Sequence, residues 1–89
     1  MSMLYTIYTE SKNLEQVREE VRACFPSFTM YEGVGFWRGG QEVSLTIEIL
    51  AEDNQHDDHL VRTVALNIKA LNKQQKILIT KGQCSVNFI

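Results

Sequence analysis

The clearest hydrophobic pattern in the chain runs from residue 27 to residue 50, where apolar and polar residues alternate on both sides of a glycine-rich break. A period of two places successive side chains on opposite faces of a β-strand. The apolar positions of the two runs are Phe28, Met30, Val34 and Phe36, followed by Val43, Leu45, Ile47 and Ile49. Arg38, Gly39 and Gly40 suit a tight turn between them. The pattern therefore predicts a β-hairpin with one apolar face.

A period of three to four residues replaces this alternation between Asn13 and Phe25. The apolar positions there are Leu14, Val17, Val21 and Cys24. This spacing is typical of an amphipathic helix. Asn13 and Gln16 have the spacing of a capping box, and Pro26 disfavours the helical conformation in the residue before it. We therefore expect a helix whose start and end are both marked in the sequence.

A second helix is predicted after the acidic segment 51–58, AEDNQHDD. Its apolar stripe consists of Val61, Val64, Ala65, Ile68 and Leu71. Carboxylates at the start of a helix are favoured by the helix dipole, so the acidic segment suits this position.

Segments 3–9, 74–80 and 83–89 are predicted to be strands, with a turn at Lys81 and Gly82 between the last two. The first has apolar residues on both faces, as expected of a strand that is covered on both sides. The predicted order is β-α-β-β-α-β-β. This order indicates an α+β, ferredoxin-like sandwich with two helices on one face of a mainly antiparallel sheet.

Composition limits the classes of function that remain open. The 89 residues form a single domain, 1–89, with a thin margin of stability that an oligomer would widen. A net charge of −2 without a basic cluster argues against binding to nucleic acid. The sequence shows neither a signal peptide nor an apolar stretch that could span a membrane, so we expect a cytoplasmic protein. Cys24 and Cys84 occupy apolar positions and are predicted to be buried free thiols.

The segment FWRGGQEVSLTIEI, after a strand and before a helix, resembles the central hairpin of the CutA and PII signalling group. This resemblance covers about half of the chain and implies a ferredoxin-like fold that forms trimers, with ligands in clefts between subunits. Two features of the group are missing: the connection from Arg38 to Gln41 is too short for the long PII loop, and the His-Pro-Tyr segment of CutA is absent. Nucleotide binding and roles related to copper are therefore not carried over.

The polar face of the hairpin is the principal candidate site. Gly33 and Gly35 lie between Tyr31 and Trp37, so two aromatic rings flank a strip of bare backbone. Another subunit, a protein partner or a small planar ligand could cover this strip, or the aromatic residues could simply be scattered on the surface. Arg38 beside Trp37 could pair with an acidic ligand or lie along the indole ring.

Glu32 lies on the otherwise apolar face of its strand and is a weak candidate for a general acid or base. A β-bulge at Gly33 or Gly35 would turn the Glu32 side chain outward.

His56 and His59 are one helical turn apart among carboxylates and are weak candidates for metal ligands, although a solvated helix start explains the same composition. The chain contains no pattern for a nucleophile, a phosphate loop or a dinucleotide, and we predict no cofactor.

These observations favour a non-catalytic regulatory or binding protein that acts as a homo-oligomer, a trimer or a dimer, and engages a small ligand or partner protein near the hairpin aromatics. Two alternatives remain open. One is a small enzyme in which Glu32 and a histidine act as an acid-base pair in a cavity between sheet and helices. The other is an accessory inhibitor protein encoded by a mobile element. Whether the protein is an enzyme is uncertain from the sequence, and a non-enzyme is favoured.

Overall fold

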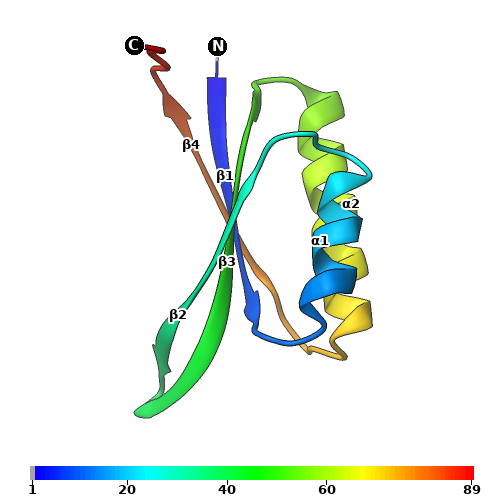
Figure 1. Ribbon diagram of the computed structural model, residues 1–89, viewed down its shortest axis with the longest axis vertical. Helices are drawn as coiled ribbons and strands as arrows, with labels where there is room; N and C mark the ends of the chain where they lie inside the picture. The colour runs from blue at the N-terminus through cyan, green and yellow to red at the C-terminus, as the bar shows by residue number, and fades with distance from the viewer. Residues whose placement is uncertain (1) are drawn as a thin grey trace.

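The computed structural model describes residues 2–89, apart from the side chain of Trp37. Its elements, in chain order, are β1 (Ser2–Glu10), α1 (Leu14–Arg22), β2 (Thr29–Trp37), β3 (Gly40–Glu52), α2 (Gln55–Leu71) and β4 (Leu78–Cys84). The strands form one antiparallel sheet in the order β2-β3-β1-β4. Both helices lie on one face of this sheet (Figure 1), and they contact each other. The predicted ferredoxin-like α+β class is confirmed.

The hydrophobic core lies between the helices and the two central strands. The sheet contributes Met3, Tyr5, Ile7, Leu45, Ile47 and Ile49, and the helices contribute Val17, Val21, Val61, Val64, Ala65 and Ile68. All of these side chains are buried. The predicted helical stripes and the alternation in β3 thus identify the core face of each element. Leu71 is only partly buried, at the edge of this core, and Leu14 of the first predicted stripe is exposed.

The C-terminal part of the chain differs from the prediction of two strands joined by a turn. Lys81 and Gly82 lie within the single strand β4, where they pair with Tyr5 and Leu4 of β1. Pairing with β1 holds this segment extended, although a Lys-Gly pair alone favours a turn. Residues 85–89 follow β4 without forming a strand.

The start of α1 also differs from the predicted capping box. Asn13 has a φ of 55°, in the left-handed region, and its side chain does not cap the helix. Instead, the amide nitrogen of Asn13 donates a hydrogen bond of 2.9 Å to the side-chain oxygen of Asn72. The helix ends at Arg22, three residues before the predicted end at Phe25.

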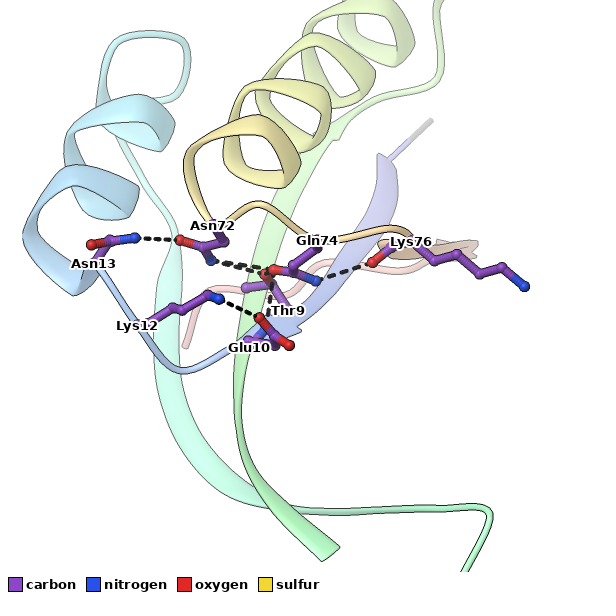
Figure 2. Close-up of polar contacts among 7 residues, drawn as sticks. All are labelled: Thr9, Glu10, Lys12, Asn13, Asn72, Gln74 and Lys76. Carbon is purple, nitrogen blue, oxygen red and sulfur yellow. Dashed lines mark hydrogen bonds and ion pairs between the residues drawn. The ribbon is translucent and has the colours of Figure 1, made fainter. Parts of the chain in front are cut away.

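Asn72 joins several distant parts of the chain at one end of the sheet (Figure 2). Its side chain is 1% exposed and donates to the hydroxyl of Thr9, at 3.3 Å, and to the side-chain oxygen of Gln74, at 3.2 Å. Thr9 in turn donates to Gln74, whose amide reaches the carbonyl of Lys76 at 3.0 Å. These bonds connect the end of β1, the start of α1, the end of α2 and the segment before β4.

A second polar cluster lies on the helix side of the sheet around Asp58 of α2. Its carboxylate accepts hydrogen bonds from the Tyr5 hydroxyl at 3.1 Å, from Lys81 at 3.2 Å and from Arg62 at 2.8 Å. Hydrogen bonds from Arg62, and then from Lys81, lower the pKa of Asp58 to about 2. Burial, followed by the hydrogen bond to Asp58, raises the pKa of Tyr5. This cluster holds α2 against β1 and β4.

Candidate functional site

The β2-β3 hairpin extends well beyond the rest of the sheet. Strand β1 pairs with β3 only over residues 44–52, so residues 34–43, which we call the arm, have no third strand beside them. Figure 1 shows the arm projecting past the helices. Trp37 pairs with Gly40, and the two residues between them, Arg38 and Gly39, have φ values of 50° and 80°. A two-residue turn with positive φ matches the twist of a hairpin, so the predicted hairpin and its turn are confirmed.

The helix-side face of the arm is apolar and uncovered. Val34, Phe36 and Val43 point to the same side as the core residues of β3, and their exposed fractions are 57%, 75% and 56%. We call these three residues the arm row. An ordered hairpin that exposes three large apolar side chains on one side is unusual for an isolated domain and is typical of an interaction surface.

The opposite face of the hairpin carries the predicted aromatic site. Tyr31 is exposed there, and a Cβ atom at Gly33 would have no atom within 4 Å, so this strip of backbone is open. At Gly35 a Cβ would lie 3.5 Å from the Ser44 hydroxyl, an ordinary contact distance. The side chain of Trp37 lies outside the described part of the structure, so its position beside Tyr31 and Arg38 stays a prediction.

Glu32 lies on the helix side of β2. Each residue from Thr29 to Trp37 pairs with one residue of β3, so no bulge turns Glu32 to the other face. Its side chain is nevertheless exposed. It lines an open groove of about 380 Å³ between α1 and β2, together with Leu14, Glu15, Arg18, Phe28, Met30, Tyr31 and Leu45. Neither histidine lines this groove, so the structure does not bring together the acid-base pair that the enzyme hypothesis requires.

The face of the sheet that points away from the helices, here called the open face, has a banded arrangement. Strand register places Tyr31, Thr46, Tyr8 and Leu78 in one row across all four strands. The next row is polar and contains Thr29, Glu48, Thr6 and Thr80, and beyond it lie Leu50, Leu4 and Gly82. The large apolar side chains of this face are exposed: Leu4, Tyr8, Tyr31, Leu50 and Leu78. Two apolar bands therefore border a polar one.

A second groove, of about 570 Å³, lies on the open face near the two chain termini. Its apolar lining includes Leu4, Phe28, Leu50 and Val86, and its polar lining includes Glu48 and Thr29. Its volume is within the range typical of small-molecule sites. It does not include the arm.

The open-face patch was only partly predicted from the sequence. Tyr31 was identified, but Leu4, Tyr8, Leu50 and Leu78 were not proposed as site residues. The available signal was the apolar residues on both faces of segment 3–9, from which we expected a strand covered on both sides. In the structure, helices cover one face of β1, whereas Leu4 and Tyr8 on the other are exposed.

The remaining candidate groups are dispersed. His56 and His59 are exposed at the start of α2. Residues 2–89 contain no group of three or more His, Cys, Asp or Glu side chains arranged to hold a metal ion. Cys24 and Cys84 are free thiols, but each is partly exposed rather than buried as predicted, because Cys24 lies at the margin of the core and Cys84 lines the groove on the open face. Neither α1 nor α2 has the length and hydropathy that a membrane-spanning helix needs.

No protein-family model matches the chain, and no curated protein matches its sequence. Solved structures do share its fold. A DUF3240 family protein from Shewanella baltica has a TM-score of 0.73 at 12% identity, over 99% of this chain and 94% of that one. The PII-like protein CPII from Thiomonas intermedia, bound to ADP, AMP and bicarbonate, has a TM-score of 0.66 at 13% identity, over 99% and 94%. The CutA protein from Archaeoglobus fulgidus has a TM-score of 0.65 at 10% identity, over 99% and 88%. The chain therefore has the ferredoxin-like fold of the CutA and PII-like group, as the sequence resemblance implied.

Proposed function

We propose that this protein is a non-catalytic regulatory or binding protein that assembles with copies of itself through the open face. The observation that carries the proposal is the set of exposed apolar side chains on that face, namely Leu4, Tyr8, Leu50 and Leu78 together with Tyr31. A short chain has a small free energy of unfolding, and covering such an apolar surface in an assembly increases it. The fold shared with PII-like and CutA proteins supports a regulatory or binding role.

The small ligand or partner protein is proposed to bind near Tyr31, Trp37 and Arg38, over the open backbone at Gly33 and Gly35. A planar ligand can approach bare backbone closely, and an aromatic ring offers it a stacking surface. Adenine nucleotides and bicarbonate are the first ligands to test, because the structurally similar CPII was solved with ADP, AMP and bicarbonate.

The assembly is tested by measuring the solution mass with light scattering. The wild-type protein is expected at a multiple of the chain mass of 10.2 kDa. Substitution of Leu50→Lys with Leu78→Lys places two charges on the open face and should lower the mass to that of a single chain. Leu66→Lys is the matched control, since Leu66 is an exposed leucine on α2, outside the open face. A wild-type protein that stays at 10.2 kDa at high concentration would contradict the proposal.

The ligand site is tested separately by titration calorimetry. Tyr31→Ala and Arg38→Ala should each weaken binding of the ligand at least tenfold, and Arg38→Ala should do so without changing the solution mass, because Arg38 lies in the hairpin turn outside the open-face patch. A ligand that binds both variants and the wild-type protein equally would show that the site lies elsewhere.

A further inference from the structure

The groove between α1 and β2 runs along the free edge of the sheet. Strand β2 has a neighbour on one side only, because the strand order is β2-β3-β1-β4. Three successive residues of β2 line the groove, Met30, Tyr31 and Glu32, and successive side chains of a strand point to opposite faces. A groove that touches all three therefore follows the edge of the strand, where backbone N–H and C=O groups have no strand to pair with. It shares only Tyr31 with the ligand site proposed above.

The deepest part of this groove is apolar. Leu45 is buried beneath it, and Phe28 and Met30 are partly buried and pack against the core. Leu14, the first residue of α1, adds an apolar side chain that is 38% exposed. The volume of about 380 Å³ is that of a small-molecule site. A compact apolar side chain of a ligand would displace water from these residues, which favours binding.

The walls of the groove carry charges of both signs. Glu15 and Arg18 are three residues apart and share one face of α1, whereas Glu32 lies across the groove on β2. Within residues 2–89, neither Glu15 nor Glu32 has an ion-pair or hydrogen-bond partner. Arg18 has a long, exposed ion pair, in which its Nε is 3.9 Å from the carboxylate of Glu19. The groove therefore offers a ligand one guanidinium group and two unpaired carboxylates.

This combination of charges selects the class of ligand. A simple amine would be repelled by Arg18, and a fatty acid would be repelled by Glu15 and Glu32. A zwitterion satisfies both signs. We propose that the groove binds an apolar α-amino acid such as L-leucine, with its carboxylate on Arg18, its ammonium group on Glu32 and its side chain on the apolar residues between them. This site goes beyond the proposed function and does not depend on the proposed assembly, because α1 is on the other side of the sheet from the open face.

The binding is tested by titrating L-leucine into the whole protein and recording amide chemical shifts by NMR. The ligand is small and the charges of the groove are exposed, so we expect a dissociation constant on the order of 1 mM. The resonances of residues 14–18 and 28–32 should shift and approach saturation at about 20 mM ligand, well above that constant. The absence of shifts at this concentration, or shifts confined to other residues, would overturn the inference.

Three analogues of L-leucine test the class of ligand. Isocaproate lacks the ammonium group, isoamylamine lacks the carboxylate, and N-acetyl-leucine amide lacks both charges. Each should bind more weakly than L-leucine by about fivefold or more, because each loses at least one charge pair. Equal binding of an analogue would instead assign the groove to fatty acids, to amines or to extended peptides, respectively.

Two variants with matched controls test the residues. Arg18→Gln and Glu32→Gln should each weaken L-leucine binding about fivefold. The controls are Arg22→Gln, in the last turn of α1, and Glu42→Gln, on the arm, since neither residue lines the groove. Both controls should bind as the wild-type protein does, and all four variants should keep the wild-type solution mass. Unchanged binding by Arg18→Gln and Glu32→Gln would contradict the site. A wild-type protein that is monomeric but binds L-leucine at these residues would disprove the proposed assembly and support this inference.

Discussion

At the level of single residues, the buried amide of Asn72 has the greatest structural consequence outside the apolar core. It bonds to Asn13, Thr9 and Gln74, which lie in three separate parts of the chain. A buried polar group that loses its partner costs about 1–3 kcal/mol, and removing Asn72 leaves several partners unpaired. We therefore predict that Asn72→Ala lowers the free energy of unfolding by about 2 kcal/mol or more, as measured by urea denaturation.

The control for Asn72 is Asn67→Ala. Asn67 also donates a side-chain hydrogen bond, to Glu20 at 3.1 Å, but this bond is exposed. An exposed bond is replaced by water, so the change in the free energy of unfolding should stay within about 0.5 kcal/mol. Equal losses in the two variants would show that the network around Asn72 has no special role.

Asp58 determines how stability responds to acid. Its pKa is about 2 in the folded protein against an ordinary value of 3.8, so the folded state favours the ionised carboxylate. The contribution of Asp58 is then fully present above about pH 4 and disappears as the pH falls to about 2. We expect the free energy of unfolding of the wild-type protein to decrease over this interval.

Asp58→Asn should flatten that decrease, as measured by urea denaturation at several pH values. Glu42→Gln removes an exposed carboxylate from the arm and should leave the pH dependence as in the wild-type protein. An Asp58→Asn protein with an unchanged slope below pH 4 would mean that other carboxylates cause the acid sensitivity.

At the level of elements, the hairpin turn depends on one glycine more than on the others. Gly39 has a φ of 80°, where a side chain is strained, whereas Gly33 has ordinary backbone angles and open space around its Cβ position. Gly39→Ala should destabilise the protein by about 1 kcal/mol. Gly33→Ala should stabilise it by about 0.4–1 kcal/mol, because it restricts the unfolded chain. Thermal unfolding of the two variants measures both effects, and a shift of the same sign in both would contradict this account.

The elements also show how far the sequence alone could predict the structure. The strict alternation from Val43 to Ile49 predicted β3 well, because burial of one face imposes that period. The capping box at Asn13 failed because the side chain bonds to Asn72, which is 59 residues away. The turn at Lys81 and Gly82 failed because pairing with β1 overrides the local preference. Both errors arise from long-range contacts that no local pattern records.

Prediction of the candidate site from the sequence is limited in the same way, because local patterns do not record long-range contacts. Periodicity identified the apolar face that carries Phe36, and glycine spacing identified the strip beside Tyr31. Neither pattern could indicate that the helices stop short of the arm. Neither could indicate that strand order places Tyr8 between Tyr31 and Leu78 on the open face. A sequence pattern shows which side of an element is apolar, but the fold decides what covers that side.

At the level of the whole molecule, the large exposed side chains of the open face, through which we propose that the protein assembles, are apolar. Screening by salt weakens contacts between exposed charges and leaves apolar contacts almost unaffected. We therefore predict that the solution mass is unchanged when the NaCl concentration rises from about 0.05 M to about 0.5 M. A fall to the mass of a single chain, measured by light scattering over this range, would indicate an assembly held by ion pairs instead.

The strand order β2-β3-β1-β4 also has a consequence for how the protein is made. Strand β1 precedes the other three strands in the chain, yet it lies between β3 and β4, and Ser2 pairs with Cys84. The local β2-β3 hairpin can form during translation, whereas β1 gains its second neighbour only after β4 has emerged. We therefore expect one edge of β1 to stay unpaired until β4 has left the ribosome, and in this interval the nascent chain is most open to wrong strand pairing.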